Sequence, residues 1–254
     1  MKICRFSIKG ETFAGVIEED RITLFENNRR RNESYPLSDV KLVAPVNPSK
    51  IVCVGRNYAE HAAELGNEVP AEPLLFLKAP SAVINHDENI KLPKYSKQVE
   101  HEGELAIVIG RKCRSLFDDE DPFDHILGYA CLNDVTARDL QKKDGQFTRS
   151  KSFDTFCPIG PFIETDIDLK NGGVTTRVNG EVRQSGKFSQ MVFPVEFLIR
   201  YISRQMTLKA GDVIATGTPS GVSKLNPGDI CEVEIEGIGV LQNTVAEARA
   251  LARA

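Results

Sequence analysis

The chain has 254 residues, of which 41% are hydrophobic and 27% charged, and these fractions are typical of a globular protein with a sizeable core. The formal net charge of −4 gives no electrostatic reason to expect a nucleic acid or an anionic membrane as a partner. No apolar stretch has the length of a signal peptide or a membrane span, so we expect a cytoplasmic protein.

The first 45 residues contain short β-like runs at 3–8, 13–17 and 22–25, separated by charged turns. The basic run Arg29-Arg30-Arg31 lies beside acidic residues and is interpreted as an exposed turn rather than a binding patch. Pro45 and Pro48 then interrupt any regular element. We therefore place a boundary here and predict a small N-terminal β domain at 1–45 and a catalytic domain at 46–254.

Short strand candidates recur along the rest of the chain. The Asn179-Gly180 pair is favoured in two-residue hairpin turns, and the glycine-rich segment 236–239 predicts another hairpin. The predicted strands are 51–54, 74–77, 105–109, 126–132, 174–178, 213–216, 231–235 and 240–244.

Only three segments indicate helices, at 58–65, 135–142 and 195–206. In the last of them Phe197, Leu198, Tyr201 and Ile202 form one apolar stripe, which suits either a dimer contact or core packing. The fold class is therefore α+β and β-dominated, with long connections that carry the chemistry. The six cysteines show no Cys-x-x-Cys pairing and are interpreted as reduced packing residues, although their even number leaves disulfides open.

Three carboxylates form the most informative pattern. Glu102 and Glu104 are two residues apart, so on a strand they project from one face, and Asp134 can reach the same point from a neighbouring strand. The alternative is an acidic, solvated strand face. Residues 105–109 are apolar on both faces, which indicates a buried strand, and buried carboxylates require a metal ion or a basic cluster. An all-oxygen donor set favours Mg²⁺ or Mn²⁺ over zinc.

A second candidate unit is His61 with Glu64. Three residues apart on a helix, they lie on one face, so Glu64 could orient the imidazole and leave one ring nitrogen as a base. Alone, such a pair is more often a solvated surface contact. Taken singly, Lys151 is equally well a surface lysine, and the loop at 215–222 an ordinary turn without a phosphate-loop ending.

Together these motifs resemble the fumarylacetoacetate hydrolase family, over roughly residues 50–245. The ordered segments that carry the resemblance are Val54-Gly55-Arg56-Asn57-Tyr58, His61-x-x-Glu64, Glu102-x-Glu104, Asn133-Asp134-Val135-Thr136-Ala137-Arg138-Asp139, Lys151-Ser152-Phe153-Asp154 and Thr216-Gly217-Thr218-Pro219.

The resemblance is to the smaller bacterial and archaeal members, and it implies a mixed β-sandwich roll that forms a homodimer. A divalent ion would be bound by Glu102, Glu104 and Asp134. The acylpyruvase and oxaloacetate decarboxylase branch implies that His61 and Glu64 activate water. The remaining implied site residues are Arg138, Gln141 and Thr218 as substrate-binding groups and Lys151 as a catalytic group.

Asn57 departs from the larger relatives, which have an additional aspartate ligand near this position, so fumarylacetoacetate itself is not expected as the substrate. The leading expectation is a Mg²⁺- or Mn²⁺-dependent hydrolase that cleaves a carbon–carbon bond in an acylpyruvate-type 2-oxo acid. Alternatives are a 2-hydroxyhepta-2,4-diene-1,7-dioate or 5-carboxymethyl-2-hydroxymuconate isomerase, or an oxaloacetate decarboxylase, using the same stabilised enolate. A catalytically inactive metal-binding homologue is the alternative of another class. For the far end of the substrate, Arg56, Lys78 and Arg149 are candidates.

Overall fold

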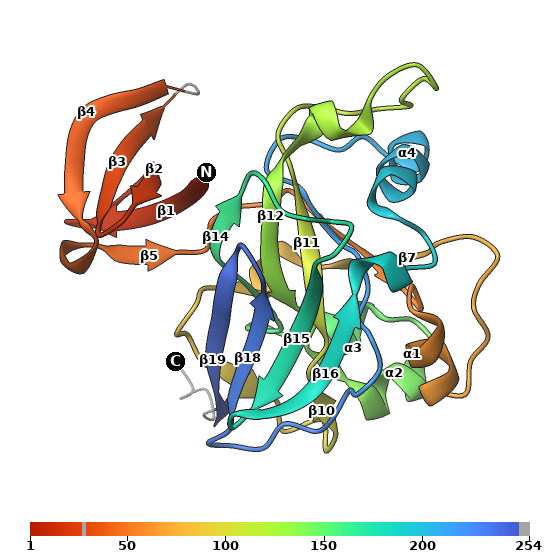
Figure 1. Ribbon diagram of the computed structural model, residues 1–254. Coiled ribbons are helices and arrows are strands. Elements are labelled where there is room, and N and C mark those ends of the chain that lie inside the picture. Colours follow the sequence, from red (N-terminus) through yellow and green to blue (C-terminus); the bar gives the residue numbers. More distant parts are fainter. Residues whose placement is uncertain (27–28, 249–254) are drawn as a thin grey trace.

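A computed structural model describes residues 1–26 and 29–248 of the chain (Figure 1). It is β-dominated, as predicted, and most strands lie in two sheets, one of twelve strands and one of five. The large sheet contains β1 (Lys2–Ile8), β2 (Glu11–Glu18), β3 (Arg21–Glu26), β4 (Arg29–Pro36), β5 (Lys41–Val43), β6 (Ile51–Gly55), β7 (Leu74–Lys78), β8 (Val83–Ile84), β11 (Gly103–Ile109), β12 (Ile126–Asn133), β14 (Cys157–Glu164) and β17 (Val213–Ala215).

The second sheet contains β9 (Ile90–Leu92), β15 (Gly173–Val178), β16 (Glu181–Lys187), β18 (Ile230–Ile235) and β19 (Gly239–Glu247), and a small ladder joins β10 (Val99–Glu100) to β13 (Thr136–Ala137). The sheets are mixed, because β17 runs parallel to β6 while most other pairs are antiparallel. The helices are α1 (Ala59–Glu64), α2 (Arg138–Asp144), α3 (Thr148–Lys151) and α4 (Val195–Gln205), with 3-10 turns at Leu37–Asp39, Pro80–Ala82, Pro122–His125 and Phe188–Gln190.

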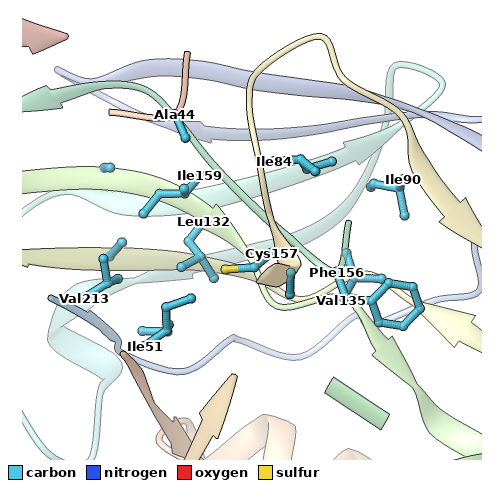
Figure 2. Packing of buried hydrophobic residues seen from close by; sticks show 14 of the residues in the cluster. Ala44, Ile51, Ile84, Ile90, Leu132, Val135, Phe156, Cys157, Ile159 and Val213 are labelled. Carbon is cyan, nitrogen blue, oxygen red and sulfur yellow. The ribbon is translucent and has the colours of Figure 1, made fainter. Parts of the chain in front are cut away.

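Strand β11 lies at the centre of the molecule and is buried over its whole length. Ala106 and Val108 belong to one core cluster, in which Leu132, Ile159 and Cys157 pack side by side (Figure 2). On the opposite face, Leu105, Ile107 and Ile109 belong to a second cluster together with residues of β15, β18 and β19. The prediction that this strand is buried on both faces is therefore confirmed, and it explains why every residue from Leu105 to Ile109 is apolar.

Both predicted hairpins are present. Asn179 and Gly180 have φ angles of 54° and 79°, the left-handed conformation that a two-residue hairpin turn requires, and they join β15 to β16. The second turn joins β18 to β19, with Ile235 paired to Gly239. These turns fix the register of the five-stranded sheet.

The helices agree with the sequence in part. Helices α1 and α4 lie within the predicted ranges, but α2 begins at Arg138 rather than at 135, because Thr136 and Ala137 pair with β10. In α4, Leu198 and Ile202 are completely buried, whereas Phe197 is 44% exposed. Core packing therefore accounts for only part of the predicted apolar stripe.

Strands β4 and β14 are among those that the sequence analysis did not predict. Residues 29–31 begin strand β4 rather than a turn, although their side chains are exposed as expected. Strand β14 was not predicted, because Pro158 and Pro161 argue against a strand, yet it lies in the sheet between β1 and β12. The β12–β14 register shifts opposite Pro161, so this proline occupies an irregular part of the ladder.

The N-terminal strands, red and orange in Figure 1, continue the large sheet, because Lys2 and Ile3 of β1 pair with β14. No regular element lies between β5 and β6, but Ala44 and Val46 are buried in the first core cluster. A domain boundary near residue 45 stays a prediction. All six cysteines are buried and free. No helix of the described residues combines the length and the hydropathy needed to cross a membrane.

Candidate active site

Three buried carboxylates meet where β11 begins and β12 ends. Gly103 of β11 pairs with Asn133 of β12, and the Asp134 N–H donates to the Glu102 carbonyl oxygen at 2.8 Å. One carboxylate oxygen from each of Glu102, Glu104 and Asp134 lies within 4.8 Å of the other two. The structure thus brings together the three residues that the sequence analysis identified.

A donor from the protein holds one oxygen of each carboxylate. Arg138 Nη2 donates to Glu102 Oε1, Lys78 Nζ donates to Asp134 Oδ1, and the Gly217 N–H donates to Glu104 Oε2 at 2.8 Å.

Lys151 reaches the remaining oxygens of two of these carboxylates. Its Nζ donates to Glu102 Oε2 and to Asp134 Oδ2, at 2.7 Å each. The basic cluster that the sequence left open is therefore present beside the three carboxylates.

The basic groups do not neutralise the acidic ones completely. With Glu100, which binds Arg138 Nε at 2.7 Å, four carboxylates face the three cations Lys78, Arg138 and Lys151, which leaves one negative charge. Burial opposes ionisation of Glu102, but Lys151 and Arg138 lower its pKa below the usual range. Burial, together with the charges of Asp134 and Glu102, raises the pKa of Glu104 well above its ordinary value. A divalent cation fits this donor set, because it would supply the positive charge that Glu104 lacks.

His61 and Glu64 form the contact expected of them on helix α1. His61 Nδ1 lies 3.0 Å from Glu64 Oε2, and the other oxygen of Glu64 accepts the Gly221 N–H at 2.9 Å. The His61 side chain is only 7% exposed, which excludes a solvated surface contact. With Nδ1 bound to a carboxylate, Nε2 is the atom left for proton transfer.

A cavity of about 320 Å³ joins the two units. Glu102, Glu104 and His61 line it, whereas Asp134 lies behind them and is completely buried. The other lining residues are Val54, Gly55, Arg56, Leu65, Asn67, Phe76, Arg138, Gln141, Lys142, Gly145, Phe147, Lys151 and Thr218.

The predicted substrate-binding residues all line this cavity, but two of them are already engaged. The guanidinium of Arg138 binds Glu100, Glu102 and Gln141 Oε1. The Thr218 hydroxyl donates to the Gly103 carbonyl at 2.8 Å and accepts a hydrogen bond from Gln184 Nε2. Arg138 and Thr218 therefore hold parts of the site in place, while the amide nitrogen of Gln141 remains for a ligand.

Two of the candidates for the far end of the substrate were wrong. Lys78 is buried in its ion pair with Asp134, and Arg149 is exposed and pairs with Asp144 outside the cavity. Only Arg56 lines the cavity.

The sequence analysis missed Glu100, Gln184 and the role of Lys78. Glu100 follows the same two-residue spacing as the other glutamates and could have been found by it. Nothing in the local sequence distinguishes Gln184. Lys78 directly follows an apolar strand, which was a weak signal of burial.

Asn57 binds the backbone. Its Oδ1 accepts the Phe193 N–H at 2.8 Å, and its Nδ2 donates to the carbonyl oxygens of Phe193 and Thr216. Each polar atom of the amide thus has a partner in the protein, and the side chain holds these backbone segments together.

Two family models match this chain. Residues 50–246 match the family model "Fumarylacetoacetate (FAA) hydrolase C-terminal", and residues 1–45 match "Rv2993c-like, N-terminal". The oxaloacetate tautomerase YisK of Bacillus subtilis is 46% identical over 226 residues, covering 83% of this chain and 75% of that protein. The mitochondrial oxaloacetate decarboxylase of Dictyostelium discoideum is 46% identical over 196 residues, 74% of this chain and 89% of that protein.

Among solved structures, a 5-carboxymethyl-2-hydroxymuconate delta-isomerase from Mycobacterium smegmatis is 41% identical. It aligns with a TM-score of 0.90 over 98% of this chain and 100% of that one. Relatives of this kind are enzymes, and the family model spans the whole candidate site. The chain belongs to the fumarylacetoacetate hydrolase family.

Proposed function

We propose that this protein is a divalent-metal-dependent enzyme that moves the proton beside the carbonyl group of a 2-oxo acid, as a tautomerase or isomerase does. The observation that carries the proposal is the His61–Glu64 contact at 3.0 Å, on the wall of the cavity that Glu102 and Glu104 also line. The names of an oxaloacetate tautomerase that is 46% identical and a delta-isomerase that is 41% identical support the same reaction class.

His61 is the proposed general base and acid. With Nδ1–H donating a hydrogen bond to Glu64, the ring has an unprotonated Nε2 that can take a proton from a bound substrate and return it at another atom. Glu64 is itself held by the Gly221 N–H, so the ring stays oriented during the transfer. Positioned acid–base groups of this kind contribute roughly 10²- to 10⁴-fold to a rate.

Glu102, Glu104 and Asp134 are the proposed ligands of Mg²⁺ or Mn²⁺. The bound ion would supply positive charge beside the 2-oxo group, where negative charge develops as the proton leaves. Lys151, with Nζ on Glu102 and Asp134, adds fixed positive charge at the same wall, and Gln141 offers an amide donor. A homodimer is part of the proposal through the family resemblance.

Hydrolysis of a carbon–carbon bond in an acylpyruvate is the second candidate. The same dyad could deprotonate water instead of a carbon acid. A solved fumarylacetoacetate hydrolase from Exiguobacterium antarcticum is 40% identical with a TM-score of 0.84. This similarity supports hydrolysis as the second candidate reaction. Decarboxylation of oxaloacetate would need the same stabilisation of negative charge on the 2-oxo group, but it would not need an attacking water molecule.

The test supplies the purified protein and Mg²⁺ or Mn²⁺ with oxaloacetate and, separately, with acetylpyruvate. Enol absorbance follows tautomerisation, and pyruvate release follows decarboxylation or cleavage. We expect rapid loss of the oxaloacetate enol, slowed by about 10²-fold or more in His61→Ala. His86→Ala, a histidine outside the cavity, serves as the matched control.

Two results would contradict the proposal. If neither acid reacts at any concentration of either ion, the enzyme class is wrong. If Glu102→Gln with Glu104→Gln binds Mn²⁺ in calorimetry as well as the parent does, the metal site is wrong. Cleavage of acetylpyruvate without conversion of oxaloacetate would favour the hydrolase.

A further inference from the structure

The cations that line the cavity are of two kinds. Arg138 and Lys151 are buried and ion-paired to the acidic cluster. Arg56 and Lys142 line the same cavity, and among residues 1–26 and 29–248 no carboxylate lies within ion-pair distance of either. The cavity therefore contains positive charge that the protein does not use for its own structure.

Arg56 has an unfavourable backbone conformation. Its φ is +59°, in the left-handed region that side chains with a Cβ rarely adopt. Such a conformation persists only where the surrounding structure enforces it, and it is found most often at functional sites.

Asn57 supplies this enforcement. It is completely buried, and its side chain makes three hydrogen bonds to the backbone of Phe193 and Thr216. A Cβ at Gly217 would lie 2.8 Å from the Asn57 Cβ, so the two segments are in close contact. The residue after Arg56 is thus fixed to the loop that also holds Glu104, and Arg56 is kept at the cavity wall.

We propose that Arg56, assisted by Lys142, binds a second carboxylate at the far end of the substrate and so selects a dicarboxylic 2-oxo acid; this inference rests on the proposed function. The planar guanidinium matches a carboxylate with two parallel hydrogen bonds. A second negative charge in a cavity that Glu102 and Glu104 also line would be repelled without such a cation. The volume of about 320 Å³ limits the substrate to a small molecule.

The test compares oxaloacetate with 2-oxobutyrate, in which a methyl group replaces the second carboxylate. Binding to the Mn²⁺-loaded protein is measured by calorimetry, and turnover is measured in parallel. We expect Arg56→Gln to weaken oxaloacetate binding about 10- to 100-fold and to leave 2-oxobutyrate binding unchanged. Lys142→Gln should act in the same direction but less strongly, and Arg56→Lys should restore part of the preference.

Lys143→Gln is the matched control, because Lys143 neighbours Lys142 on α2 but does not line the cavity. Thermal unfolding checks that each variant is folded. The inference is overturned if Arg56→Gln weakens both acids equally, or neither, or if the parent does not prefer oxaloacetate. A parent that prefers oxaloacetate through Arg56 but converts neither acid would support this inference and contradict the proposed function.

Discussion

At the scale of single residues, a backbone N–H group holds one of the three carboxylates of the site in position. Glu104 receives its one hydrogen bond within the described residues from the Gly217 N–H, at 2.8 Å. Gly217 has a φ of +98°, and a Cβ there would lie 3.0 Å from the Val54 carbonyl oxygen. Only glycine lets this loop approach both Val54 and Glu104.

Gly217→Ala is therefore expected to weaken Mn²⁺ binding and to lower the free energy of unfolding by more than the roughly 1–2 kcal/mol of left-handed strain alone. Gly228→Ala is the control, because Gly228 has a φ of +90° but a Cβ added there would meet no atom within 4 Å. Calorimetry and chemical denaturation measure the two effects. Equal losses in both variants would show that close packing at Gly217 does not matter.

At the scale of elements, strand β16 of the small sheet connects two segments of the site. Gln184 Oε1 accepts from His101 Nδ1 and from the Gly103 N–H, at 3.0 Å each. Its Nε2 donates to Thr218 Oγ1 and to the Pro219 carbonyl, at 2.7 Å each.

Both protons of the Gln184 amide nitrogen are donated to Thr218 and Pro219, and the amide oxygen can only accept. The hydrogen bond between this oxygen and His101 therefore requires the imidazole proton to lie on Nδ1. Nε2 of the same ring then accepts from the Ser223 hydroxyl. Burial is the main cause of the lowered pKa of His101, and a lowered pKa favours the neutral ring. One buried side chain thus fixes the segment before β11 to the loop after β17.

Gln184→Leu removes all four hydrogen bonds and leaves buried groups unpaired, each at a cost of about 1–3 kcal/mol. We expect a clear loss in the free energy of unfolding, together with weaker substrate binding. Gln184→Glu should also be destabilising, because a carboxylate cannot donate to Thr218 or Pro219. Gln190→Leu, which removes one exposed hydrogen bond to Lys187, is the control. Denaturation curves that superimpose for the two leucine variants would contradict this role.

At the scale of the whole molecule, the N-terminal strands extend the sheet that carries the site. Ile3, Ala44 and Val46 pack in the same core cluster as Ile159 and Ile163 of β14. The β1–β14 pairing also protects part of one edge of β14. We therefore expect the first 45 residues to contribute to the stability of the rest of the chain.

A chain of residues 46–254 is expected to unfold at a lower temperature than the full chain and to aggregate more readily, because part of one edge of β14 and part of the core become exposed. Thermal unfolding and light scattering measure this. An unchanged midpoint would show that residues 1–45 form an independent unit.

The sequence by itself determined the local features of this protein. The turn at Asn179 and Gly180, the buried strand that follows Glu104, and the two-residue and three-residue spacings of the acidic and His61–Glu64 pairs all follow from short-range geometry. Strand β14 could not be predicted, because its two prolines argue against a strand, and only the pairing with β12 shows that Pro161 occupies an irregular part of the ladder.

Only the tertiary structure decided which charges meet. Lys78, Lys151 and Arg138 come from separate elements, and their contacts with Asp134 and Glu102 depend on how β7, α2 and α3 fold against the ends of β11 and β12. The same holds for Arg56, which lines the cavity without an acidic partner among the described residues. Spacing along a chain fixes which face a side chain takes, whereas charge compensation depends on three-dimensional proximity between segments far apart in sequence.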